Sequence, residues 1–101
     1  MLPAIEAVDD TLRETQALVL TPTRELSDQV CAEAQRLAHG SNCRVTSCVG
    51  GKDIRRQIES LKKGSQVVVG TPGRLLDLIS RRVLNLDKLR IVIFLVNFFV
   101  F

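Results

Sequence analysis

A pattern that occurs twice in this chain constrains its fold most: a short aliphatic run, then Thr-Pro-x-Arg, then an amphipathic stretch. The first copy is residues 17–24, and the second is residues 67–74, fifty positions later. Each copy predicts a buried strand that leads into a helix, because Thr is a good N-cap and Pro suits the first helical position. Repeated strand–helix units favour an α/β fold with a parallel sheet and right-handed crossovers.

The remaining hydrophobic periodicity divides most of the chain into further strands and helices. Helices are expected over residues 2–14, 22–38, 53–64 and 72–82, and strands over residues 17–20, 44–49, 67–69 and about 89–94. Gly40 and Gly64 mark two of the helix ends. Because the strands are parallel, their C-terminal ends share one edge of the sheet, which is where open parallel sheets bind ligands.

Three short motifs are expected at that edge, and their chemistry points to an anion. The unpaired amides and the dipole of a helix N-terminus favour negative charge, and an Arg in the same turn matches a phosphate. The Gly50-Gly51 pair adds backbone N–H groups with no side chain in the way. Taken singly, each motif has an ordinary explanation as a helix cap or a flexible turn. Three at one edge favour a chain of phosphates, and the candidate binding residues are Pro22, Thr23, Arg24, Gly50, Gly51, Thr71, Pro72, Gly73 and Arg74.

Composition sets limits on the class of protein. The 101 residues, 46% hydrophobic and 25% charged, are typical of one small globular domain, and the net charge of +3 is only a weak indication of nucleic acid. Cys31, Cys43 and Cys48 lack Cys-x-x-Cys spacing and are accompanied by one histidine, His39, so we expect reduced structural thiols and no metal site. We see no secretory signal, and the apolar stretch 91–101 is shorter than the about 20 residues that cross a bilayer. We therefore expect no membrane partner and an intracellular location, cytoplasmic or nuclear.

The motifs Pro22–Leu26, Gly50-Gly51 and Thr71–Arg74, in this order and spacing, resemble the first RecA-like domain of DEAD-box ATP-dependent RNA helicases, nearest the translation-initiation-factor branch. The resemblance covers roughly residues 1–93 and implies a partial RecA-like three-layer domain. It also implies that RNA is the partner: Arg24 and Arg74 would meet phosphates, while Thr23, Gly51, Thr71 and Gly73 would supply hydroxyl or amide donors. Contacts confined to the sugar-phosphate backbone carry no base information, so such binding would be tolerant of RNA sequence and sensitive to salt.

Two departures from the family pattern bear on catalysis. The full-length family uses ATP and Mg²⁺, but this chain has no Gly-x-x-x-x-Gly-Lys-[Ser/Thr] loop. Leu95–Phe98 stand where the family places Asp-Glu-Ala-Asp, so the carboxylates for the metal and the attacking water are missing. We expect neither ATP hydrolysis nor unwinding from this chain alone, and we assign it no catalytic residue and no cofactor.

The C-terminal end differs in composition from the rest of the chain. All four Phe residues lie in the last eight positions, so residues 94–101 are interpreted as a divergent apolar tail, such as an altered reading frame, a retained intron or a truncated gene model would produce. An uncharged, β-prone segment without Pro favours aggregation. The simplest alternative for this end is a buried central strand that continues past its usual end.

Two functions from different classes remain open. The first is a truncated helicase segment that keeps its RNA-backbone contacts and lacks the ATPase centre. The second is a non-enzymatic module that binds nucleic acid or a protein partner, or a product without function. A DNA-directed relative is less favoured, because the motif pair is characteristic of the RNA group. In each case the missing remainder of the helicase core would leave sheet edges uncovered, so we expect a marginally stable or insoluble monomer.

Overall fold

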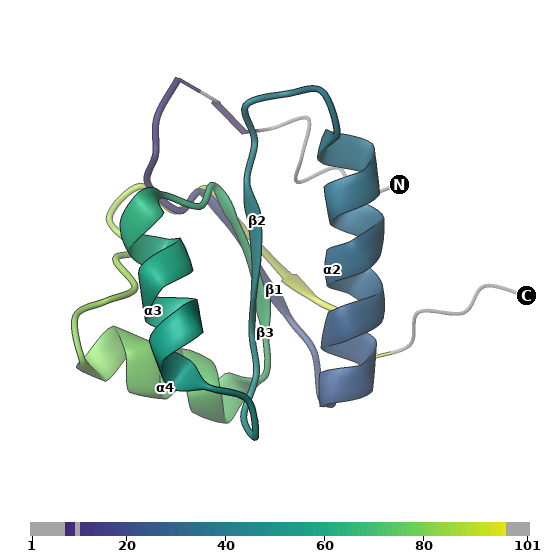
Figure 1. Ribbon diagram of the computed structural model, residues 1–101, viewed down its shortest axis with the longest axis vertical. Helices are drawn as coiled ribbons and strands as arrows, with labels where there is room; N and C mark the ends of the chain where they lie inside the picture. The colour runs from purple at the N-terminus through teal and green to yellow at the C-terminus, as the bar shows by residue number, and fades with distance from the viewer. Residues whose placement is uncertain (1–7, 10, 97–101) are drawn as a thin grey trace, which may run out of the picture.

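The computed structural model describes residues 8–9 and 11–96, and its centre is a parallel sheet with helices on both faces (Figure 1). The strands are β1 (Ala17–Leu20), β2 (Val45–Cys48), β3 (Val67–Gly70) and β4 (Ile91–Phe94), in the order β2-β3-β1-β4. The helices are α2 (Arg24–Ala38), α3 (Ile54–Lys63) and α4 (Pro72–Ser80). All three strand pairs are parallel. The prediction of an α/β fold with alternating strands and helices is therefore confirmed.

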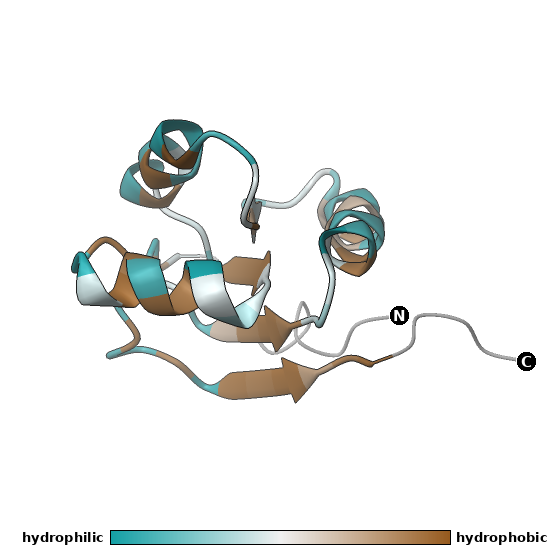
Figure 2. Ribbon diagram, turned by 90° about the horizontal axis from the view of Figure 1, so that it is seen from below, coloured by the Kyte–Doolittle hydropathy of each residue, from teal (hydrophilic) through white to brown (hydrophobic). Residues whose placement is uncertain are grey.

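The two faces of the sheet carry separate cores, because neighbouring side chains of a strand point to opposite faces. Odd-numbered residues such as Val19 and Val69 pack with Val30 and other residues of α2. Even-numbered residues such as Val68 pack with Leu75 and other residues of α4, with α3 at their margin. Figure 2 shows the hydrophobic strands lying between these helices. The completely buried run Val67–Val69 is typical of a parallel strand covered on both faces.

None of the three cysteines, all of which lie in the described part of the chain, forms a disulfide. Cys31 and Cys48 are buried, and burial is the main reason why their pKa values rise to about 11 and about 12. Both thiols are therefore protonated at neutral pH and contribute to the core as small apolar groups.

The helix predicted over residues 2–14 is wrong where the structure can test it. Residues 1–7 and 10 lie outside the described residues, but residues 11–14 form a turn and irregular backbone. The Asp9 carboxylate accepts hydrogen bonds from the N–H (3.0 Å) and the hydroxyl (2.6 Å) of Thr11. The Gln16 side chain, in turn, bonds both the N–H and the C=O of Asp9. These side-chain bonds satisfy backbone groups locally and so compete with a helix.

Two other boundaries differ from expectation. Helix α2 begins at Arg24 rather than near Pro22, because Thr23 and not Thr21 is its N-cap. Strand β4 is an outer strand of the described sheet rather than a buried central one, and Val92 and Phe94 are 45% and 74% exposed. The remaining strands and the starts of α3 and α4 agree with the sequence prediction to within one or two residues.

Candidate nucleic-acid interface

The three sequence motifs lie together at the C-terminal edge of the sheet, at the lower end of the molecule in Figure 1. Two backbone hydrogen bonds tie this edge together from strand to strand. The N–H of Thr21 donates to the C=O of Gly70 (2.9 Å), and the N–H of Thr71 donates to the C=O of Cys48 (3.2 Å). The strand ends that precede the motifs are thus fixed relative to one another.

The first motif presents Arg24 at the start of α2. The Thr23 hydroxyl accepts a hydrogen bond from the N–H of Leu26 (3.1 Å) and caps the helix. Thr21 is buried instead, and its hydroxyl bonds the side chain of Ser27 and the C=O of Gly70. The Arg24 side chain makes no hydrogen bond or ion pair with any described residue. Its guanidinium lies against Gly51, so all its N–H donors are left for a ligand.

The second motif is the loop that leads from β2 into α3. Gly51 has a φ of +80°, which favours glycine, and a Cβ at this position would overlap the Arg24 guanidinium. Gly50 has open space where a Cβ would lie. Lys52 bonds both carboxylate oxygens of Asp28 on α2 at 3.1 Å. The loop is therefore held to α2 by Lys52 and lies against Arg24 of the first motif at Gly51.

The third motif starts α4. Thr71 is the N-cap and Pro72 the first helical residue, but the Thr71 hydroxyl makes no capping bond, so it stays available. Gly73 is exposed, with no atom within 4 Å of the position of a Cβ. The Arg74 Nη1 donates to Gln57 Oε1 (2.9 Å) and to the C=O of Lys52 (3.3 Å). Arg74 thereby holds the second motif, while its other N–H donors make no hydrogen bond with the described residues.

Gln57 is a residue that the sequence analysis missed. It is 6% exposed, its Nε2 donates to the C=O of Val49 (3.0 Å), and its Oε1 accepts from Arg74. Both ends of its amide are used, so it links the residue that follows β2 to α4. The signal in the sequence is a polar residue between the apolar positions Ile54 and Ile58 of α3, on the side that faces the core.

The residues after β4 do not fit a magnesium–nucleotide centre. The N–H of Leu95 donates to the C=O of Leu20 (2.9 Å), and Val96 follows with an apolar side chain that is 84% exposed. Neither side chain can ligate a metal ion, because Mg²⁺ prefers oxygen ligands such as carboxylates. Within the described ranges, no three His, Cys, Asp or Glu side chains are grouped to hold a metal ion, and no helix has the length and apolar character needed to cross a membrane.

Comparisons with known proteins all point to one family. Residues 1–94 match the family described as DEAD/DEAH box helicase. Over 92 residues, 91% of this chain, it is 49% identical to the ATP-dependent RNA helicase CshA of Listeria monocytogenes and 40% identical to the ATP-dependent RNA helicase eIF4A of Eremothecium gossypii. The aligned part is 18% of the first relative and 23% of the second, so this chain spans about a fifth of their length.

Two solved structures share the fold. The yeast DEAD-box splicing factor Prp28 aligns with a TM-score of 0.74 and 32% identity, over 79% of this chain and 19% of that one. Dbp5 of S. cerevisiae, bound to RNA and ADP BeF3, aligns with a TM-score of 0.78 and 29% identity, over 90% of this chain and 22% of that one. The agreement with a RecA-like DEAD-box domain extends over most of the sheet and its helices.

Proposed function

Because the chain belongs to the DEAD/DEAH box helicase family, we propose that it binds the sugar-phosphate backbone of single-stranded RNA at the edge formed by its three motifs. The observation that carries the proposal is the position of Arg24. Its guanidinium lies over the Gly51 loop without a protein partner among the described residues. The resemblance to Dbp5, which was solved with RNA, supports the choice of ligand.

The donors at this edge suit phosphate and ribose groups. Arg24 and Arg74 offer guanidinium N–H groups, and Thr23 and Thr71 offer hydroxyls. The first turn of α4 adds the unpaired amide of Gly73, with Pro72 before it and Gly50 and Gly51 on the neighbouring loop. Such donors recognise phosphate oxygens and sugar hydroxyls rather than base edges. Binding is therefore expected to tolerate changes in RNA sequence.

The proposal separates RNA binding from catalysis. Residues 1–93 act as part of a first RecA-like domain, and residues 94–101 are a divergent tail. ATP hydrolysis and unwinding belong to the longer helicases, whose remaining core supplies the ATP and Mg²⁺ sites. The chain would act in the cytoplasm or the nucleus, which are reducing compartments where cysteines such as the buried Cys31 and Cys48 stay reduced.

Binding of a fluorescently labelled single-stranded RNA, measured by anisotropy over a range of salt concentrations, tests the proposal. Arg24→Ala removes a guanidinium that no described residue uses, so it should weaken binding without unfolding the chain. Each RNA phosphate that the variant no longer neutralises should make the slope of log K against log salt shallower by about 0.7. Arg36→Ala is the matched control, because Arg36 is exposed in the last turn of α2 and pairs with Glu33. Equal binding by the two folded variants would contradict the proposal.

A further inference from the structure

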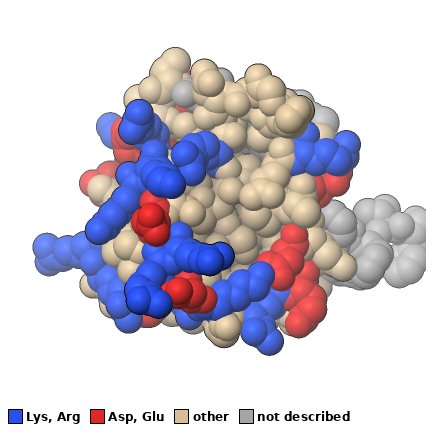
Figure 3. All heavy atoms as spheres, in the orientation of Figure 1, with Lys and Arg blue, Asp and Glu red and all other residues tan. Residues whose placement is uncertain are grey.

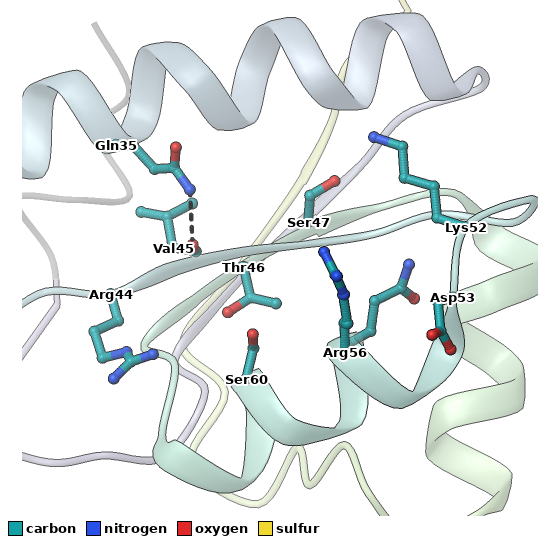
Figure 4. Close-up of a pocket in the computed structure, with 10 residues that line it drawn as sticks. Gln35, Arg44, Val45, Thr46, Ser47, Lys52, Asp53, Arg56 and Ser60 are labelled. Atoms are coloured by element: carbon teal, nitrogen blue, oxygen red, sulfur yellow. Dashed lines mark hydrogen bonds between the residues drawn. The ribbon is translucent and has the colours of Figure 1, made fainter.

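A hollow of about 700 Å³ lies along the free edge of β2, between α2 and α3 (Figure 4). It begins beside the Gly50-Gly51 loop, where Lys52 and Arg56 line it, and it ends at Arg44, just before β2. Ser47 and Thr46 of β2 lie at its centre, with Ser60 of α3 facing Thr46. Figure 3 shows Lys and Arg side chains gathered over α3 on this face of the molecule.

The open edge of β2 offers mainly hydrogen-bond donors. The carbonyls of Arg44 and Cys48 accept from Val67 and Thr71, so alternation along the strand turns residues 45, 47 and 49 outward. Two of the three outward carbonyls are already occupied. Gln35 Nε2 bonds the C=O of Val45 (3.3 Å), and Gln57 Nε2 bonds the C=O of Val49. These caps blunt the edge against a further strand and leave a surplus of N–H groups.

The side chains around the hollow add further donors. The hydroxyl oxygen of Ser47 is buried and has no hydrogen-bond partner in the described part of the chain. The guanidinium groups of Arg44 and Arg56 also make no hydrogen bond or ion pair with the described residues. Lys52 is paired with Asp28. The one carboxylate that lines the hollow, Asp53, caps α3 and pairs with Arg55, and these bonds hold the pKa of Asp53 below its usual range.

We infer that this hollow is a second phosphate-binding segment, which receives the RNA strand after it leaves the Gly50-Gly51 loop. The inference rests on the proposed function, because it extends the same strand along β2. Lys52 borders both the loop and the hollow, so the two surfaces are continuous. Four residues of β2 span about 13 Å at about 3.3 Å per residue, so basic groups stand at both ends of a short backbone path.

The test compares Arg44→Ala/Arg56→Ala with the unaltered chain, using single-stranded RNAs of increasing length. The double variant should bind the shortest RNAs with the same affinity as the unaltered chain. Its affinity should be lower for RNAs that are long enough to reach past the three motifs. With long RNA, its salt slope should be shallower by about 1.4, the value for two phosphates that are no longer neutralised, at about 0.7 each. Arg44→Lys/Arg56→Lys, which keeps both charges, should recover most of the slope.

Lys62→Ala/Lys88→Ala removes two exposed charges that do not line the hollow, and it serves as the control. Equal binding of long RNA by the two alanine pairs, with Arg24→Ala still defective, would overturn this inference and leave the proposed function intact. Unchanged RNA binding in every variant, or no binding by the unaltered folded chain, would overturn both. A polyglutamate peptide that binds through Arg44 and Arg56 while RNA does not would identify an acidic polypeptide as the ligand instead and overturn the inference.

Discussion

At the scale of single residues, the two arginines of the repeated motif have different roles. The Arg24 guanidinium has no hydrogen-bond or ion-pair partner among the described residues, whereas the Arg74 guanidinium is held by Gln57 and by the C=O of Lys52. Gln57 is thus a positioning residue: its amide fixes the Arg74 guanidinium and the C=O of Val49 at once. The position of Arg74 beside the Gly50-Gly51 loop thus depends on a buried amide.

Replacing Gln57 should therefore affect both stability and binding. Gln57→Ala leaves the buried carbonyl of Val49 without its donor and removes one of the two acceptors of the Arg74 guanidinium, which together cost about 2 kcal/mol of unfolding free energy. We expect urea denaturation to show this loss of stability. RNA binding, measured without urea on the folded variant, should also weaken. Gln57→Glu, which keeps an acceptor for Arg74, should recover more RNA affinity than Gln57→Ala.

Gln35→Ala is the matched control, because Gln35 also donates to a β2 carbonyl but from an exposed position. Its unfolding free energy should change by less than about 0.5 kcal/mol. The positioning role would be refuted if Gln57→Ala lowered the unfolding free energy no more than Gln35→Ala does, or if it bound RNA with unchanged affinity.

At the scale of elements, the two copies of Thr-Pro-x-Arg start their helices differently. In the first copy the third residue, Thr23, caps α2 through its side chain, and Thr21 is buried. In the second copy the first residue, Thr71, is the N-cap and makes no side-chain capping bond. The helix dipole therefore begins two residues later in the first copy than in the second.

This difference predicts that shortening Thr23 affects mainly stability, whereas shortening Thr71 affects mainly RNA affinity. Thr23→Ala removes the bond to the N–H of Leu26 and should lower the unfolding free energy by about 1 kcal/mol. Thr71→Ala removes no such bond, so its stability should change by less than about 0.5 kcal/mol while its RNA affinity falls. Chemical denaturation of both variants measures the first effect and anisotropy the second. A larger loss of stability for Thr71→Ala would contradict this assignment of the caps.

The sequence predicted the strands, the parallel sheet and the shared edge well, because these follow from local periodicity and from the rules of strand–helix connection. It could not separate Thr21 from Thr23, since both are capping residues. The choice depends on the bonds of Thr21 to Gly70 and Ser27, which come from distant or later parts of the chain. The bond between Gln57 and Arg74 likewise depends on how α3 packs beside α4. The RNA contacts assigned to the nine motif residues stay a prediction.

At the scale of the whole molecule, the two outer strands of the described sheet differ in how well they are protected against pairing with a strand of another chain. The edge of β2 is blunted by Gln35 and Gln57. Strand β4 pairs with β1 on one side and with no described strand on the other. Val92 and Phe94 of β4 are 45% and 74% exposed, and Val96, two residues after the strand, is 84% exposed, so large apolar side chains are exposed at alternate positions. An unprotected edge with such side chains favours pairing with another chain.

We therefore expect the chain to self-associate through β4, and Phe94→Lys to shift it toward monomer, because an edge lysine opposes strand pairing. Sedimentation velocity over a range of protein concentrations measures the change. Leu76→Lys is the control: Leu76 is equally apolar and 66% exposed, but it lies on α4. RNA affinity should be the same for both variants, since neither residue belongs to the binding edge. A chain that stays monomeric at every concentration, or an equal response to the two lysines, would show that the exposed edge of β4 does not govern association.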